Sequence, residues 1–188
     1  MYWPDSYKVL KNENQFQLGE YEIIPIRYGD RYEIMRWRND QIFHLRQDKP
    51  LTNRDQDYYF DRVLKKNFDK KNPNQLLFSF LQKKKLVGYG GLVHIDWGSN
   101  NAEISFVINS DKEKIHFRTY WLTFLELIEN ISFNKLNFQK IFVYSYEVRP
   151  NLYDVLSEAN YIQEARLKSH KIINGFFFDV LIYSKFRL

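Results

Sequence analysis

Residues 75–108 read QLLFSFLQKKKLVGYGGLVHIDWGSNNAEISFVI, and this stretch decides the class of fold. It contains three apolar and aromatic runs, at residues 75–82, 86–95 and 102–108, which two short polar turns connect. Runs of this kind that follow one another across short turns pair as an antiparallel meander. We therefore expect three neighbouring strands at the centre of the molecule.

The segments before the meander contain two helix signals. Asp30 with Glu33, and Thr52 with Asp55, have the spacing of a helix capping box. The elements expected in this part are, in chain order, a polar irregular extension (1–20), a strand (21–26) and two helices (31–39 and 52–68).

The segments after the meander end in a hairpin. Asn174 and Gly175 form a strong signal for a two-residue hairpin turn, and Pro150 is suited to the first position of a helix. The elements expected here are, in chain order, a charged loop (109–116), an apolar-striped helix, a strand (140–146), a short helix from Pro150 and a hairpin (161–173 and 176–183). The sequence therefore predicts an α+β fold, with one domain over residues 21–188.

The composition excludes several classes of protein. The chain has 188 residues, a formal charge of +5 and no cysteine, so disulfides, thiolate metal sites and cysteine nucleophiles are excluded. Its four histidines lack the close spacing of metal ligands, and we expect no metal. The positive charges are scattered, which argues against nucleic acid as a partner. There is no long apolar run, so we expect no membrane partner and a cytoplasmic location.

The order of these elements resembles the GNAT superfamily of acetyl-CoA-dependent N-acetyltransferases. Several local stretches are similar to the branch that acetylates ribosomal-protein alanines and amino sugars: Trp37-Arg38-Asn39-Asp40, Gly88-Tyr89-Gly90-Gly91-Leu92, Ala102 to Ile108, Leu156 to Tyr161, and the terminal hairpin. The resemblance implies a mixed, mostly antiparallel seven-stranded sheet flanked by about four helices. It also implies acetyl-CoA as co-substrate, direct transfer to a small-molecule amine, and a possible homodimer.

The chain departs from the family at the loop that receives the cofactor pyrophosphate. The family has a glycine-rich signature there, in which bare backbone amides meet the phosphates. This chain has no glycine over residues 110–121. We expect Lys112, Lys114 and Arg118 to supply positive charge to the pyrophosphate instead.

A second departure lies in the last helix. The family places an Asn at the end of the preceding strand and, seven residues later, a Tyr that protonates the departing thiolate. Arg149 and Leu156 occupy these positions here. Tyr153, one turn earlier, is the nearest phenol, and we expect it to serve as the acid.

The strand over residues 102–108 carries the candidate base. By the period of two, Glu103, Ser105 and Val107 share the face opposite Ala102, Ile104, Phe106 and Ile108. A carboxylate on a central strand, near the point where the family's sheet separates, is suited to act as a general base. We therefore expect Glu103 to be catalytic.

The resemblance also implies where the two substrates bind. The backbone amides of Phe106, Val107 and Ile108 are expected to bind the pantetheine arm as an added strand does. The residues expected near the acceptor are Arg38, His44, Arg46, His94 and His170.

The sequence thus predicts an acetyl-CoA-dependent N-acetyltransferase. The net positive charge favours an anionic acceptor, and a nucleotide-linked amino sugar of surface-polysaccharide synthesis is the leading prediction. Two alternatives remain open: a protein N-terminal acetyltransferase, and a GNAT-fold binding or scaffold protein that has lost acetyl-CoA.

Overall fold

The computed structural model describes residues 2–11 and 13–187. Its helices are α1 (Arg31–Asp40), α2 (Asn53–Tyr58), α3 (Lys65–Phe68), α4 (Ser110–Glu129) and α5 (Pro150–Glu158). Its strands are β1 (Phe16–Leu18), β2 (Tyr21–Pro25), β3 (Leu76–Gln82), β4 (Lys85–Asp96), β5 (Asn101–Ile108), β6 (Lys140–Tyr146), β7 (Ile162–Ile173) and β8 (Phe176–Phe186). Shorter elements are 3-10 turns at Lys8–Leu10, Tyr28–Asp30 and Ile42–His44, and π-helical segments at Tyr59–Leu64 and Asn130–Lys135. The α+β fold and the central meander are confirmed.

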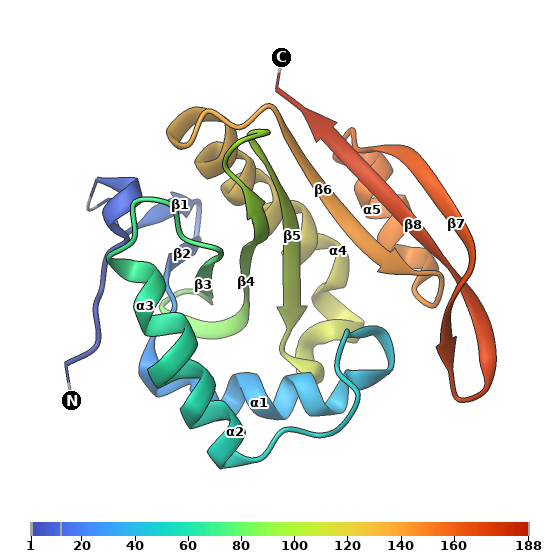
Figure 1. Cartoon of the computed structure of the whole chain (residues 1–188), viewed down its shortest axis with the longest axis horizontal. Coiled ribbons are helices and arrows are strands. Elements are labelled where there is room, and N and C mark those ends of the chain that lie inside the picture. Colours follow the sequence, from blue (N-terminus) through green and yellow to red (C-terminus); the bar gives the residue numbers. More distant parts are fainter. Residues whose placement is uncertain (1, 12, 188) are drawn as a thin grey trace.

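The described strands form one eight-stranded sheet in the order β1-β2-β3-β4-β5-β6-β8-β7. All neighbouring strands are antiparallel except β5 and β6. This parallel pair meets only over residues 101–103 of β5 and 140–142 of β6, although both strands continue beyond them. The sheet therefore opens into a wedge after Glu103, which we call the splay (Figure 1).

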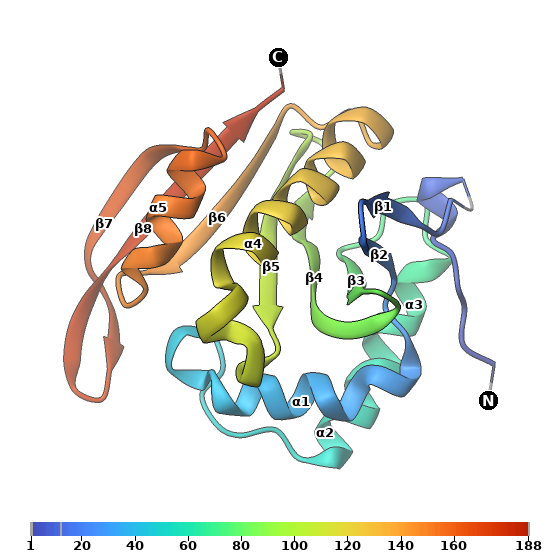
Figure 2. The same ribbon diagram turned by 180° about the vertical axis from the view of Figure 1, so that it is seen from behind.

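Helices cover the sheet on both faces. Helices α4 and α5 lie on one face (Figure 2), and α2 and α3 lie on the other (Figure 1). The Phe106 ring of β5 stacks on Phe124 of α4 with centroids 3.9 Å apart. Because side chains alternate along a strand, Glu103 and Ser105 point to the α2–α3 face. The predicted division of this strand into two faces is confirmed.

The expectation of an irregular N-terminal extension is wrong for residues 16–18. These residues form β1, which pairs with β2 and brings the sheet to eight strands instead of seven. Tyr7 is also buried, stacks on Phe68 at 4.3 Å and donates its hydroxyl to the Leu77 carbonyl at 2.7 Å. The extension therefore packs into the core of the domain. Met1, Asn12 and Leu188 lie outside the described residues.

The expected charged loop over residues 109–116 is also wrong, because α4 begins at Ser110. The Asn109 side chain caps this helix by accepting the Asp111 N–H at 2.9 Å. Asp30, expected to cap α1, instead accepts hydrogen bonds from Arg27 and Ser79. The predicted capping box of Thr52 and Asp55 is confirmed.

Gly90 and Gly91 lie where β4 passes closest to its neighbours. A Cβ atom on Gly91 would lie 1.9 Å from the Leu76 carbonyl oxygen, and one on Gly90 would lie 2.2 Å from that of Ser105. Neither neighbour can move without breaking the sheet, because both contacts are with backbone atoms.

We expect Gly91→Ala to lower the free energy of unfolding by about 3 kcal/mol, since overpacking against backbone destabilises a core by this order. Gly98→Ala is the matched control, because its Cβ would meet only Asp96 Oδ1 at 3.4 Å. Urea unfolding of the two variants measures the difference, and equal midpoints would refute this view of β4.

Candidate active site

A cleft of about 700 Å³ passes through the splay. Its walls come from both faces of the sheet: Glu103 and Tyr144 on the α2–α3 face, and Phe106 and Trp121 on the α4–α5 face. Two molecules that enter from opposite faces can therefore meet inside the sheet, as direct transfer between two bound substrates requires.

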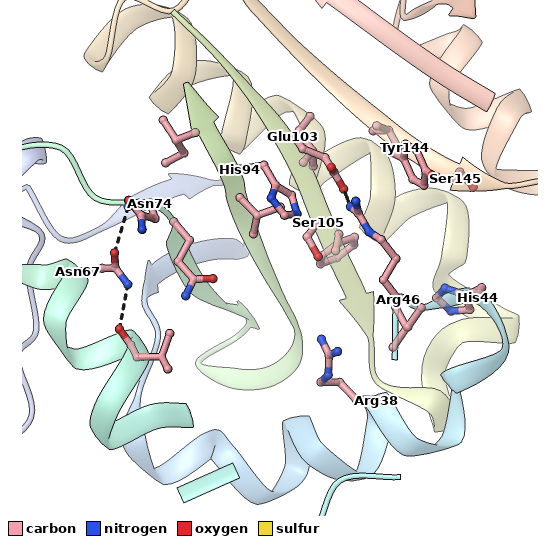
Figure 3. Close-up of a pocket in the computed structure, with 18 of the residues that line it drawn as sticks. Arg38, His44, Arg46, Asn67, Asn74, His94, Glu103, Ser105, Tyr144 and Ser145 are labelled. Atoms are coloured by element: carbon pink, nitrogen blue, oxygen red, sulfur yellow. Dashed lines mark hydrogen bonds and ion pairs between the residues drawn. The ribbon is translucent and has the colours of Figure 1, made fainter. Parts of the chain in front are cut away.

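Glu103 lies at the point where β5 and β6 separate. It is 5% exposed, and its Oε1 accepts a hydrogen bond from Arg46, which comes from the loop between α1 and α2 (Figure 3). The Arg46 guanidinium also lies 4.6 Å from the centre of the Tyr144 ring. The structure thus brings together two residues that the sequence singled out for different reasons. The Arg46 guanidinium thus pairs with the Glu103 carboxylate by a charge-assisted hydrogen bond.

His94 faces Glu103 and Ser105 from the neighbouring strand (Figure 3). It lies in a β-bulge where the β4–β5 register shifts, and its φ of 48° is rare for a residue other than glycine. Burial, and then the Arg46 charge, lower the pKa of His94 below its usual 6.5. The imidazole is therefore mostly neutral at pH 7 and is able to accept a proton.

A network of polar side chains lies between the C-terminal ends of β5 and β6, where the two strands are apart. Arg149, which precedes α5, pairs with Glu113 of α4, and its Nη1 lies 3.4 Å from His44 Nδ1. His44 Nε2 lies 3.3 Å from Gln41 Oε1, and Gln41 Nε2 donates to the Ile108 carbonyl at 2.7 Å. Arg149 only donates, which assigns His44 Nδ1 as an acceptor and Nε2 as the protonated nitrogen.

The half-buried His44 makes stability depend on pH. Desolvation, and then the Arg149 charge, lower the pKa of His44 from 6.5 to about 3. Between these values the unfolded chain binds a proton that the folded chain does not, so acid favours unfolding.

Lowering the pH from 7 to 5 is expected to reduce the free energy of unfolding by about 2 kcal/mol through His44 alone. His44→Gln should remove most of this loss, because glutamine does not titrate. Urea unfolding of both proteins at the two pH values measures it, and an equal loss in both would contradict this role.

Two further expected acceptor residues lie in different surroundings. Arg38 lines the cleft, where its Nη1 donates to the Tyr89 hydroxyl at 2.8 Å. His170 is exposed on β7, with its ring 6.5 Å from that of Tyr144, and it does not line the cleft.

The residues expected to bind pyrophosphate do not line the cleft. Lys112 and Lys114 are exposed on α4, and Arg118 pairs with Glu158 of α5. The placement follows from the early start of α4, which turns the expected loop into a helix surface. The cation that lines the splay on this side is Arg149.

Tyr153, the expected acid, also lies outside the cleft. Its hydroxyl donates to the Tyr146 carbonyl at 2.9 Å, and its ring stacks on Tyr183 at 5.6 Å. These contacts remove it from the candidate acids. Tyr146 lines the cleft and takes its place as the candidate phenol.

The direction of the backbone groups along β5 decides which of the three expected residues can bind the pantetheine arm. The Asn109 N–H donates to the Val87 carbonyl, so by alternation Val107 turns its backbone groups toward β4. Phe106 and Ile108 turn theirs toward β6, which no longer pairs with β5 there. Because the Ile108 carbonyl already accepts a hydrogen bond from Gln41, Ile108 offers its N–H. We therefore keep Phe106 and Ile108 and drop Val107 as candidate pantetheine contacts.

Sequence reasoning missed a row of cations beside the cleft: Arg62, Lys66 and Lys70, which we call the basic stripe. Their spacing of four residues was the available signal, since such residues share a helix face. Arg62 lies in the π-helical segment, Lys66 lies in α3, and Lys70 lies just after the end of α3. The buried Asn67 fixes this segment, because its amide donates to the Val63 carbonyl at 3.0 Å and accepts the Asn74 N–H at 3.1 Å (Figure 3).

Two kinds of feature are absent from the described residues. No group of three His, Asp or Glu side chains among residues 2–11 and 13–187 is arranged to hold a metal ion. Across the same residues, no helix has the length and apolar character needed to span a membrane.

Comparison with known proteins identifies the family. A family model described as an acetyltransferase (GNAT) domain matches residues 23–182, which is most of the chain. No curated protein matches the chain. The expected family is confirmed, and the ribosomal-protein-alanine and amino-sugar branch stays a prediction.

Two solved structures of the spermidine N-acetyltransferase of Vibrio cholerae are similar in fold. The complex with CoA and spermine has 19% identity and a TM-score of 0.76 over 90% of this chain and 97% of that chain. A dodecameric structure in an intermediate state has 19% identity and a TM-score of 0.73 over 90% and 95%. At this identity the likeness supports the fold.

The residues of the cleft fit acetyl-CoA. Its pantetheine arm carries amides, and the splay offers strand-edge groups at Phe106 and Ile108 and the buried indole N–H of Trp121, which has no partner among the described residues. Its diphosphate is anionic, and Arg149 lines the same side. When bound, acetyl-CoA supplies an activated acetyl group to an attacking amine. With its family match and its splayed sheet, the chain belongs to the GNAT acetyltransferase family and is an acetyl-CoA-dependent N-acetyltransferase.

Proposed function

We propose that the acceptor is an amine on a small anionic molecule, and that a nucleotide-linked amino sugar is the class that fits best. The charge of the cleft carries this proposal. Among the residues that the structure describes, six cations and one carboxylate line it: Arg38, Arg46, Arg62, Lys66, Lys70 and Arg149, with Glu103. A lining of this kind attracts phosphate groups.

The three cations of the basic stripe are the ones best placed to bind an anionic ligand, because the other cations of the cleft already have partners in the protein. Arg46 is paired with Glu103 and Arg149 with Glu113, and the Arg38 guanidinium donates to Gln47 and to the Tyr89 hydroxyl. Arg62, Lys66 and Lys70 are exposed and have no carboxylate within 4.0 Å among the residues that the structure describes. They lie on the α2–α3 face, opposite the side that fits acetyl-CoA. An acceptor with phosphates at the stripe would have its amine directed toward Glu103.

A polyamine acceptor is the second candidate, because the similar solved enzyme was crystallised with spermine. The charge of this cleft opposes it. Two like charges 4 Å apart repel by about 1 kcal/mol in water and by about 4 kcal/mol near a protein surface. Glu103 is the one carboxylate in the lining, and Arg46 already neutralises it.

Glu103 and His94 are suited to accept a proton from the amine on the α2–α3 face. The amine must lose a proton to attack the thioester carbonyl, and both side chains are proton acceptors beside the splay. We propose Glu103 as the base that orients and deprotonates the amine, with His94 as the neighbouring acceptor. Tyr146 is proposed to protonate the departing thiolate.

The release of CoA thiol tests the proposal with matched acceptors: a nucleotide-linked amino sugar and the same sugar without its nucleotide. We expect kcat/KM for the linked sugar to be about 100-fold higher, because two or three charge-assisted contacts of roughly 1 kcal/mol each are gained. The advantage should shrink in high salt, which screens exposed charges. Equal kcat/KM for the two acceptors would overturn the proposal.

A further inference from the structure

We propose that Arg149 and Trp121 hold acetyl-CoA in place of the missing glycine loop: Arg149 exchanges Glu113 for the diphosphate, and the Trp121 indole N–H donates to a carbonyl of the pantetheine arm. The inference rests on acetyl-CoA as co-substrate and is independent of the acceptor proposed above.

The N-terminus of α4 is unsuited to bind an anion, because carboxylates surround it. Its first turn contains Asp111 and Glu113, and Asp40 of α1 accepts the Ser110 hydroxyl at 2.9 Å. The Asn109 side chain already occupies the Asp111 N–H. Three carboxylates at a helix N-terminus repel the phosphates that this position normally attracts. The diphosphate therefore needs a cation from another element.

Arg149 is the cation that meets this need. Its side chain is 10% exposed, it lines the cleft, and it lies 5.0 Å from the Phe117 ring of α4. A guanidinium keeps its charge even where burial lowers its pKa, and its planar set of donors matches phosphate oxygens.

The Glu113 side chain, which pairs with Arg149, has room to turn away from it. Glu113 lies on the surface of α4 with its side chain 23% exposed, so it can turn toward water while Arg149 stays in place. A buried guanidinium without a counterion is costly, so departure of Glu113 is favoured only when another anion takes its place. Glu113 thus competes with the diphosphate for Arg149.

Trp121 gives a second, independent observation. Its ring is 3% exposed and packs edge-to-face on Phe106 with centroids 5.1 Å apart. Its Nε1 has no hydrogen-bond partner among the described residues, as is also true of Trp37 Nε1 and Tyr161 Oη. Of these three residues, Trp121 is the one that lines the cleft. A buried donor without a partner is destabilising until a ligand acceptor reaches it.

Isothermal calorimetry with acetyl-CoA and with S-acetylpantetheine, which lacks the diphosphate, separates the two contacts. We expect Arg149→Gln to weaken acetyl-CoA about 50-fold and S-acetylpantetheine less than about threefold. Trp121→Phe keeps an aromatic ring but removes the indole N–H, and it should weaken both ligands about tenfold. The ¹⁵N-indole resonance of Trp121 should shift when either ligand binds.

Glu113→Gln is the deciding variant, because it keeps the size of a half-buried side chain on the surface of α4 and is expected to fold. We expect it to bind acetyl-CoA about fivefold more tightly, since it removes the competing anion. Arg118→Gln is the control, because Arg118 pairs with Glu158 outside the cleft, and its affinity should not change. The proposal fails if Glu113→Gln binds no tighter, if Arg118→Gln is the variant that weakens binding, or if the Trp121 resonance does not move. None of these results depends on the acceptor.

Discussion

Replacing Glu103 with glutamine is expected to lower the turnover number about 100-fold and to leave the affinity for acetyl-CoA within about threefold of the wild-type value. Glutamine keeps the size of the side chain but loses its charge and its basicity. Glu103 lies on the α2–α3 face, away from the side that fits acetyl-CoA, so donor binding should persist. Steady-state kinetics with saturating acceptor and calorimetry with acetyl-CoA measure the two quantities.

Glu22→Gln is the matched control for this experiment. Glu22 is also a buried glutamate on a strand and pairs with Lys84, but it lies on β2 and does not line the cleft. Its replacement removes a similar ion pair without touching the splay. If Glu103→Gln turns over as fast as the wild type, or if both variants lose activity equally, Glu103 is not the base.

Reversing two charges of the basic stripe is expected to have an effect of similar size on the acceptor. In Arg62→Glu with Lys66→Glu, two attractive charges become repulsive, and kcat/KM for an anionic acceptor should fall about 100-fold. The KM for acetyl-CoA should stay within about threefold, because the stripe lies on the opposite face.

Arg54→Glu with Lys71→Glu changes the net charge by the same amount at exposed positions outside the cleft. This control separates the local stripe from the overall charge of the protein. Equal losses in the two double variants would assign the effect to net charge and remove the stripe from the acceptor site.

Much of the fold is readable from the sequence because each central segment carries a consistent local signal. Pro150 opens α5, and Asn174 and Gly175, both with positive φ, make the hairpin turn. The β1 strand escaped prediction because three residues show no periodicity. The start of α4 was missed because the charged residues over 109–116 were interpreted as a loop, although Asn109 before an acidic first turn is a helix cap.

The site was only partly readable, because its contacts join residues far apart in the chain. The alternation along β5 placed Glu103 correctly on the polar face, yet nothing local pairs it with Arg46. The Arg149 contact with Glu113 likewise depends on how α4 and α5 pack. Tyr153 was misplaced because the phase of a short helix decides which face each side chain occupies, and this phase turns Tyr153 toward Tyr183.

A competition between two acceptors tests the proposed function most directly. The enzyme is given limiting acetyl-CoA with equal amounts of a nucleotide-linked amino sugar and spermidine, and mass spectrometry measures which amine is acetylated. The charge of the cleft predicts that the amino sugar receives nearly all of the acetyl groups, by a factor of about 100. Preferential acetylation of spermidine would contradict the proposal that this cleft selects an anionic acceptor.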